Sequence, residues 1–124
     1  MSIGHHAAQQ ALQLVGAPYR YGGNTPRGFD CSGLVQYSYA RAGASIARTT
    51  RGQRRQSRRL SSKQLRAGDL LFFNQTGKRG SHVGLYVGNN RFVHAPSSGK
   101  AVKLSTLANP YWQRHLLDAR RPEL

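Results

Sequence analysis

The strongest constraint on the fold of this chain is a block of three apolar segments in its second half. They read "AGDLLFF", with a strand beginning at Asp69, then "SHVGLYVG" and "NRFVHAP", and the last two meet at residues 88–90. Successive strands joined by a short Asn/Gly turn pair antiparallel. Two helical patterns precede the block, one over residues 5–16 and one that starts after Asp30 and ends near Gly43. Helices followed by a run of strands predict an α+β domain with an antiparallel sheet.

The remaining segments are predicted to be mainly loops. Residues 16–28 hold several glycines and two prolines, so we expect a loop there. Residues 48–66 are polar, and we expect a loop with one or two helical turns. A short helical turn is expected over residues 106–113, and a last strand near residues 115–120.

Length and hydropathy limit the organisation of the chain. With 124 residues it can bury one core but not two, so we expect a single domain over residues 7–124. Residues 1–6, "MSIGHH", are treated as an N-terminal tail, part of which cloning could have added. No stretch approaches the roughly 20 apolar residues that span a bilayer, and no apolar signal peptide is visible. We therefore expect no transmembrane segment.

The charge balance is strongly basic, with 19 Lys and Arg against 4 Asp and Glu and a formal net charge of +15. Such a surface attracts polyanions, which leaves nucleic acid, anionic cell-wall polymer and acidic lipid open. Many of the cations lie in one segment: Arg48, Arg51, Arg54, Arg55, Arg58, Arg59, Lys63 and Arg66. This segment is either a solvated basic face or a docking surface for anionic wall polymers. Nucleic acid is not expected, because residues 40–71 hold no aromatic side chain on which bases could stack.

The single cysteine, Cys31, excludes an internal disulfide. A lone cysteine is commonly a small buried hydrophobe. Here Asp30 can cap a helix whose first residue is Cys31, and the N–H groups and dipole of a helix start stabilise a thiolate. The small side chains of Ser32 and Gly33 would leave the sulfur accessible. Cys31 is therefore a candidate nucleophile.

A cysteine nucleophile needs a base and a group that orients the base. His82 opens a strand and is the candidate base, while His94 ends the next strand and could orient it. Otherwise, His82 is a solvated strand-end residue and His94 a surface residue of the hairpin. The five histidines lack the spacing of a structural zinc site, so we expect no metal or cofactor.

The register of the hairpin tests this pairing. A regular two-residue turn at Asn89-Asn90 would place Leu85 opposite His94, and His82 and His94 would then lie on opposite faces of the sheet. If the two histidines cooperate, the loop must hold an odd number of residues or a bulge must intervene. We predict one or the other.

Five segments of the chain form an ordered series of motifs. They read "GAPYRYGGNTPRGFDCSGLVQYSY", "RTTRGQ", "AGDLLFF", "SHVGLYVGNNRFVHAP" and "YWQRHLLDARR". In this order they resemble the NlpC/P60 family of cysteine peptidases from about residue 7 to residue 121. The resemblance implies a compact papain-like fold, in which the nucleophile starts a helix packed on an antiparallel sheet.

The resemblance also implies a set of site residues. Cys31 matches the family's nucleophile, His82 its base and His94 the orienting third residue. Tyr19 matches a tyrosine that lines the site in many relatives, and its hydroxyl could help the Cys31 N–H hold an oxyanion. Asp30 and Ser32 match positions that in some relatives recognise the free amine of a short stem peptide. Helix capping by Asp30 is an equally good interpretation.

The implied activity is that of a cysteine endopeptidase, which hydrolyses amide bonds in peptidoglycan stem peptides. Many relatives cut between D-glutamate and a diamino acid, and we expect that bond. We expect a monomer acting in the periplasm, in the cell envelope or after secretion. An amidase, transpeptidase or acyl transferase using the same Cys31/His82 pair stays open, as does a non-enzymatic basic module that binds polyanions.

Overall fold

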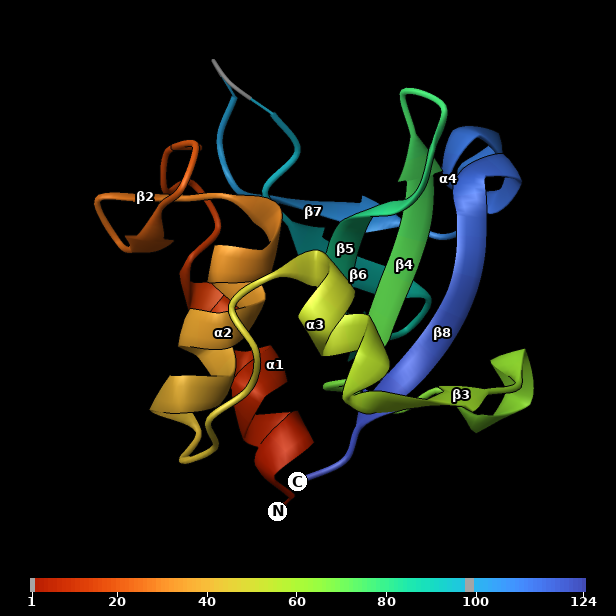
Figure 1. The fold of residues 1–124 in the computed structure, drawn as a ribbon, viewed down its shortest axis with the longest axis horizontal. Helices are drawn as coiled ribbons and strands as arrows, with labels where there is room; N and C mark the ends of the chain where they lie inside the picture. The colour runs from red at the N-terminus through yellow and green to blue at the C-terminus, as the bar shows by residue number, and fades with distance from the viewer. Residues whose placement is uncertain (1, 98–99) are drawn as a thin grey trace.

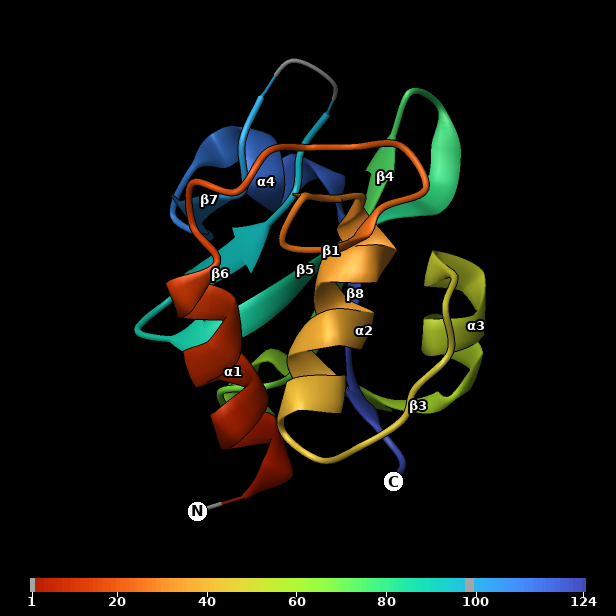
Figure 2. The same cartoon turned by 90° about the vertical axis from the view of Figure 1, so that its left-hand side faces the viewer.

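The computed structural model describes residues 2–97 and 100–124 and confirms the α+β class. The two longest helices pack on one face of an antiparallel sheet (Figures 1 and 2). The elements in chain order are α1 (Ile3–Gln13), β1 (Asn24–Thr25), β2 (Gly28–Phe29), α2 (Cys31–Arg41), α3 (Thr50–Arg55), β3 (Ser57–Leu60), the 3-10 helix η1 (Ser62–Gln64), β4 (Leu70–Gln75), β5 (Lys78–Gly88), β6 (Arg91–His94), β7 (Lys103–Thr106), α4 (Pro110–His115) and β8 (Leu116–Pro122).

The main sheet has six strands in the order β3-β8-β4-β5-β6-β7. The strands β4 to β7 form a meander, whereas β8 returns to the other edge of β4 and then pairs with β3. All these pairings are antiparallel. This return places α4, which precedes β8, beside β4 at the upper end of the sheet in Figure 1.

Each face of the sheet has its own apolar cluster, because strand side chains alternate between faces. On one face Leu70 and Phe72 of β4 pack with residues of α1 and α2, including Ala11 and Leu34. On the other face lies a second cluster, made by Leu71, Phe73, Tyr86, Phe92, Leu107 and Ala119 with the half-buried Trp112. The helices α1 and α2 therefore anchor to β5 from one side, while α4 covers part of the opposite side.

The first turn of α1 corrects the treatment of residues 1–6 as a tail. Met1 lies outside the described residues, but Ser2 caps a helix that already begins at Ile3, and its hydroxyl accepts from the His5 N–H at 3.1 Å. Gly4 packs against the backbone of Gly68, whose φ of +101° and missing Cβ permit this close approach. Residues 3–6 therefore belong to the folded domain.

The other predicted helices and strands are present, some with shifted boundaries, but several strands were not predicted. The helix after Asp30 and the three central strands lie where the sequence predicts them, and the last helical turn and strand are α4 and β8. The basic segment 48–66 forms α3 and η1, but it also holds strand β3, which was not predicted. Strands β1, β2 and β7 were also missed. No helix in the described ranges is long and apolar enough to cross a membrane.

Candidate active site

The start of α2 presents the cysteine. Asp30 is the N-cap, and its Oδ1 accepts from the Gly33 N–H at 2.7 Å, so the expected capping role is confirmed. Cys31 is the first helical residue and a free, partly exposed thiol. Its Sγ lies 3.6 Å from Oγ1 of Thr50, the first residue of α3. The thiol therefore lies between the first turns of two helices, α2 and α3.

A second interaction engages the carboxylate of Asp30. The guanidinium of Arg48 donates to both carboxylate oxygens, at 3.1 Å to Oδ1 and 2.9 Å to Oδ2. It also donates to Oγ of the buried Ser32 at 3.0 Å. Both residues that the resemblance associates with amine recognition thus bind Arg48. The bidentate pair also ties the loop before α3 to the start of α2.

The β5–β6 hairpin confirms the predicted irregularity. Gly88 pairs with Arg91 across a turn at Asn89 and Asn90, whose φ angles of 53° and 63° fit a type I′ turn. The register then shifts, and Leu85 pairs with Val93 rather than with His94. Val87 is the extra residue and forms a β-bulge. Beyond the bulge, the pairing of β5 with β6 is shifted by one residue, so the faces on which paired side chains lie differ from those in a regular hairpin. His82 and His94 consequently lie on the same face.

The two histidines form a buried pair. His82 Nε2 lies 2.9 Å from His94 Nδ1, and His94 Nε2 lies 2.8 Å from Ser105 Oγ of β7. The relative exposures of His82 and His94 are 3% and 0%. The ring of Trp112 stacks on His82 at 5.8 Å between centroids and meets His94 edge-on at 4.9 Å.

Burial sets the protonation of this pair. Desolvation lowers the pKa of His82 from 6.5 to about 4, because an imidazolium loses its hydration there. Desolvation, followed by the charges of His82 and Lys103, lowers the pKa of His94 to about 3. Both rings are therefore neutral at pH 7. Two tautomer chains of opposite direction satisfy these contacts. When His82 Nε2–H donates to His94 and His94 Nε2–H donates to Ser105, His82 Nδ1 is an acceptor; when the Ser105 hydroxyl donates to His94 and His94 Nδ1–H donates to His82, His82 Nδ1 carries the hydrogen.

One open hollow of about 630 Å³ collects most of the expected site residues. It is lined by Tyr19, Tyr21, Gly22, Asp30, Cys31, Ser32, Arg48, Thr49, Thr50 and Ser81. Burial, then the charges of Cys31, Asp30 and Tyr21, raise the pKa of the Tyr19 hydroxyl, so it stays a donor. His82 follows Ser81 directly along β5. Within residues 2–97 and 100–124, no hydrogen bond joins Cys31 to His82.

The structure adds residues that the sequence did not single out for the site. Thr50 contacts the sulfur, Ser105 continues the histidine chain, and Trp112 covers both rings. Thr50 and Trp112 lie inside the segments "RTTRGQ" and "YWQRHLLDARR", so the motif series carried a signal for them. No sequence signal indicated Ser105, because it lies outside the quoted motifs and in strand β7, which was not predicted. The described residues contain no cluster of three or more His, Cys, Asp or Glu that could hold a metal.

A cysteine at a helix start, near a strand that carries a histidine oriented by a third polar group, provides the residue types of nucleophilic catalysis. The chain belongs to the NlpC/P60 family, which it matches over residues 16–121. It is 45% identical to the bifunctional muramidase/DL-endopeptidase CwlT of Bacillus subtilis, over 91% of this chain and 35% of that protein. It is 42% identical to the murein DD-endopeptidase MepH of Escherichia coli, over 93% of this chain and 44% of that protein.

Solved structures agree with this assignment. The fold superposes on a lipoprotein-like NLP/P60 family protein from Staphylococcus aureus with a TM-score of 0.86 and 38% identity. The match covers 98% of this chain and 42% of that one. The chain thus spans less than half the length of each of these three relatives.

Proposed function

We propose that this domain is a cysteine endopeptidase that hydrolyses amide bonds in peptidoglycan stem peptides. The observation that carries the proposal is the position of Cys31. Its partly exposed thiol starts α2 in the same hollow as Ser81, the residue before the buried His82. Family membership and the names of the relatives, which include DL- and DD-endopeptidases, support the same substrate class.

In this mechanism the sulfur of Cys31 attacks the amide carbonyl and His82 takes its proton. A neutral imidazole is the form that a general base requires, and burial keeps His82 neutral at pH 7. Because Nε2 is engaged by His94, Nδ1 is the nitrogen that receives the proton. The hydrogen bond between Cys31 and His82 forms as substrate binds, since catalytic hydrogen bonds are often long before that step.

The remaining groups stabilise charge and complete the reaction. The N–H of Cys31 and the protonated hydroxyl of Tyr19 donate to the oxyanion, a contribution that is typically worth about 3 kcal/mol per donor. His82 then gives its proton to the leaving amine, and the thioester bond between Cys31 and the acyl group forms as the C–N bond breaks. His82 next activates a water, which releases the acyl group and restores the thiol.

For the scissile bond we propose the amide between D-glutamate and the diamino acid. A second candidate is the D,D cross-link between stem peptides, because MepH, which matches over 93% of this chain, is named a DD-endopeptidase. A wall substrate implies action in the periplasm, in the envelope or outside the cell. We propose in addition that the protein acts as a monomer. The basic segment would add docking to anionic wall polymers.

The proposal is tested by digesting purified peptidoglycan with the wild type and with Cys31→Ala, followed by mass spectrometry of the released fragments. We expect stem-peptide fragments with the wild type alone, and their masses identify the bond. Thermal unfolding of both proteins controls for folding. Absence of fragments from both Gram-negative and Gram-positive walls would overturn the proposal and favour acyl transfer or polyanion binding.

A further inference from the structure

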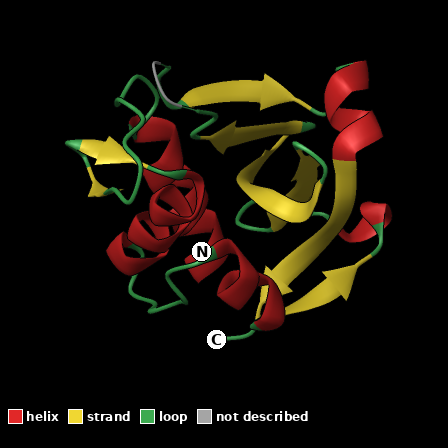
Figure 3. Cartoon of the chain, turned by 45° about the horizontal axis from the view of Figure 1, so that its top comes forward, coloured by secondary structure: helices red, strands yellow, loops and turns green. Residues whose placement is uncertain are grey.

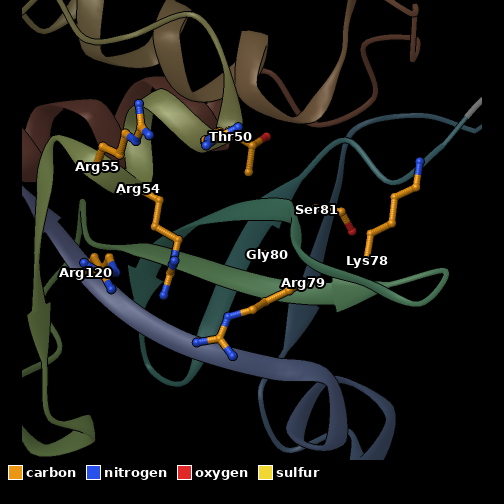
Figure 4. Close-up of a pocket in the computed structure, with 9 residues that line it drawn as sticks. Thr50, Arg54, Arg55, Lys78, Arg79, Gly80, Ser81 and Arg120 are labelled. Atoms are coloured by element: carbon orange, nitrogen blue, oxygen red, sulfur yellow. The ribbon is translucent and has the colours of Figure 1, made fainter.

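A second hollow, of about 600 Å³, adjoins the cysteine hollow and carries a high density of positive charge. It is lined by Thr50, Arg51, Arg54, Arg55, Lys78, Arg79, Gly80, Ser81 and Arg120 (Figure 4). Figure 4 shows α3 on one side and the β4–β5 hairpin on the other, with Arg54 and Arg79 lying across the strands between them. We call this hollow the basic pocket.

The charge of the basic pocket is largely uncompensated. Six of its nine lining residues are Arg or Lys, and none is acidic. Asp118, on β8, pairs with Arg54 and Arg120 at 2.7 Å and 3.1 Å. The other two aspartates are paired elsewhere, with Arg48 and Arg121. Among the described residues, the lining cations outside the Asp118 pairs have no carboxylate partner: Arg51, Arg55, Lys78 and Arg79.

The basic pocket is continuous with the candidate active site. Thr50 and Ser81 line both hollows. Thr50 is the residue whose hydroxyl lies 3.6 Å from the sulfur of Cys31, and Ser81 directly precedes His82. The two hollows therefore meet at Thr50 and Ser81, whereas Tyr19 and Asp30 line the cysteine hollow alone.

We propose that the basic pocket is a substrate subsite that binds a carboxylate of the stem peptide on one side of the scissile bond. The proposal rests on the proposed function. A D-glutamate linked through its side chain leaves its α-carboxylate free, and guanidinium groups bind carboxylates through paired charge-assisted hydrogen bonds. Opposed cations in a bounded hollow fit one anionic residue better than a long polymer. The lining holds no aromatic side chain, which is unlike a single-strand nucleic acid site.

The test compares two synthetic stem peptides that differ only in this group, one with the free D-glutamate carboxylate and one with its amide. The variant is Arg51→Gln/Arg79→Gln. The control, Arg41→Gln/Arg91→Gln, removes the same charge from exposed positions outside the pocket and outside the basic segment. We expect KM for the carboxylate peptide to rise about tenfold or more in the variant with kcat nearly unchanged. KM for the amide peptide should change little in the variant. In the control, KM for both peptides should change little.

Binding of both peptides to Cys31→Ala, measured by calorimetry, separates the subsite from catalysis. In one outcome the wild type cleaves neither peptide, Cys31→Ala binds the carboxylate peptide more tightly than the amide peptide, and Arg51→Gln/Arg79→Gln abolishes this difference in affinity. The proposed function then fails and the subsite stands. If cleavage occurs and the variant and control change KM equally, the effect is that of net charge and the subsite is overturned. Displacement of the carboxylate peptide by a glycerol phosphate polymer but not by excess amide peptide would identify a polymer site instead.

Discussion

His82 and His94 lie on the same face of the sheet, with 2.9 Å between His82 Nε2 and His94 Nδ1, because Val87 is bulged out of the strand pairing between them. The pair is enclosed by the second apolar cluster and by Trp112 of α4, the helix that adjoins the end of the long strand β8 (Figure 3). This arrangement fixes the orientation of His82 and keeps both rings neutral, and the following predictions depend on it.

Replacing His94 should reduce catalysis without preventing binding. In His94→Ala the Nε2 of His82 loses its hydrogen-bond partner, so the orientation of the His82 ring is no longer fixed. We expect kcat to fall at least about tenfold, less than the roughly 10²–10⁴-fold loss for His82→Ala, with KM little changed. His94→Gln, whose amide oxygen can accept the same hydrogen bond, should recover part of the rate. A proportional change of KM and kcat in both variants would contradict an orienting role.

The buried pair should make the protein less stable in mild acid. His82 has an ordinary pKa of 6.5 when unfolded and about 4 when folded, so the unfolded state binds more protons in this interval. The stabilisation is complete above about pH 6.5 and is lost as the pH falls toward 4. At pH 5 the solution is 1.5 pH units below the unfolded-state pKa of 6.5, which corresponds to a loss of about 2 kcal/mol in the free energy of unfolding. Urea unfolding at pH 7.5 and pH 5 measures this loss.

The same measurement on His94→Gln supplies the control. This variant removes one of the two histidines with a lowered pKa, so its stability should change less between pH 7.5 and pH 5. Carboxylates contribute little in this window because they titrate at lower pH. An unchanged or steeper dependence in His94→Gln would show that other groups carry the effect.

The pairing of Arg48 with Asp30 predicts how the enzyme treats the amine of a stem peptide. Both oxygens of Asp30 are engaged by Arg48, so little of its charge is available to a substrate ammonium group. We expect acetylation of the terminal amine to change kcat/KM by less than about tenfold, the ratio that 1.4 kcal/mol produces. In Arg48→Gln the freed carboxylate should favour the free amine. A wild type that cleaves only free-amine peptides would refute this prediction.

Trp112 should control the hydration of the histidine pair. Trp112→Ala removes the ring that stacks on His82 and meets His94 edge-on, so water can reach both imidazoles. We expect the pKa of His82 to move up from about 4 toward 6.5 in an NMR titration, with a loss of about 2 kcal/mol in stability. Trp112→Phe, which keeps an aromatic cover, should change both quantities less. An unaltered His82 pKa in Trp112→Ala would mean that other residues keep the pair dry.

Local features of this protein were readable from the sequence. The cap at Asp30 and the helix that starts at Cys31 follow from neighbouring residues, and the turn at Asn89-Asn90 follows from residue types that tolerate positive φ. The need for an irregular hairpin also followed, because strand side chains alternate. Strand β3 was missed because Arg58 and Arg59 are both exposed between buried Ser57 and Leu60, a pattern without regular alternation.

The sequence by itself determined which residues carry reactive groups, where the helix that holds Cys31 begins, and which family they resemble; it placed the strands that hold the histidines but not their starts, since β5 already begins at Lys78. Only the tertiary structure decided that Thr50 contacts the sulfur, that Arg48 engages Asp30 and that Trp112 covers the histidines. It also decided that α3 and the β4–β5 hairpin together form the basic pocket. These contacts join residues 18 or more positions apart, and their formation depends on how the sheet and helices pack rather than on any preference of neighbouring residues.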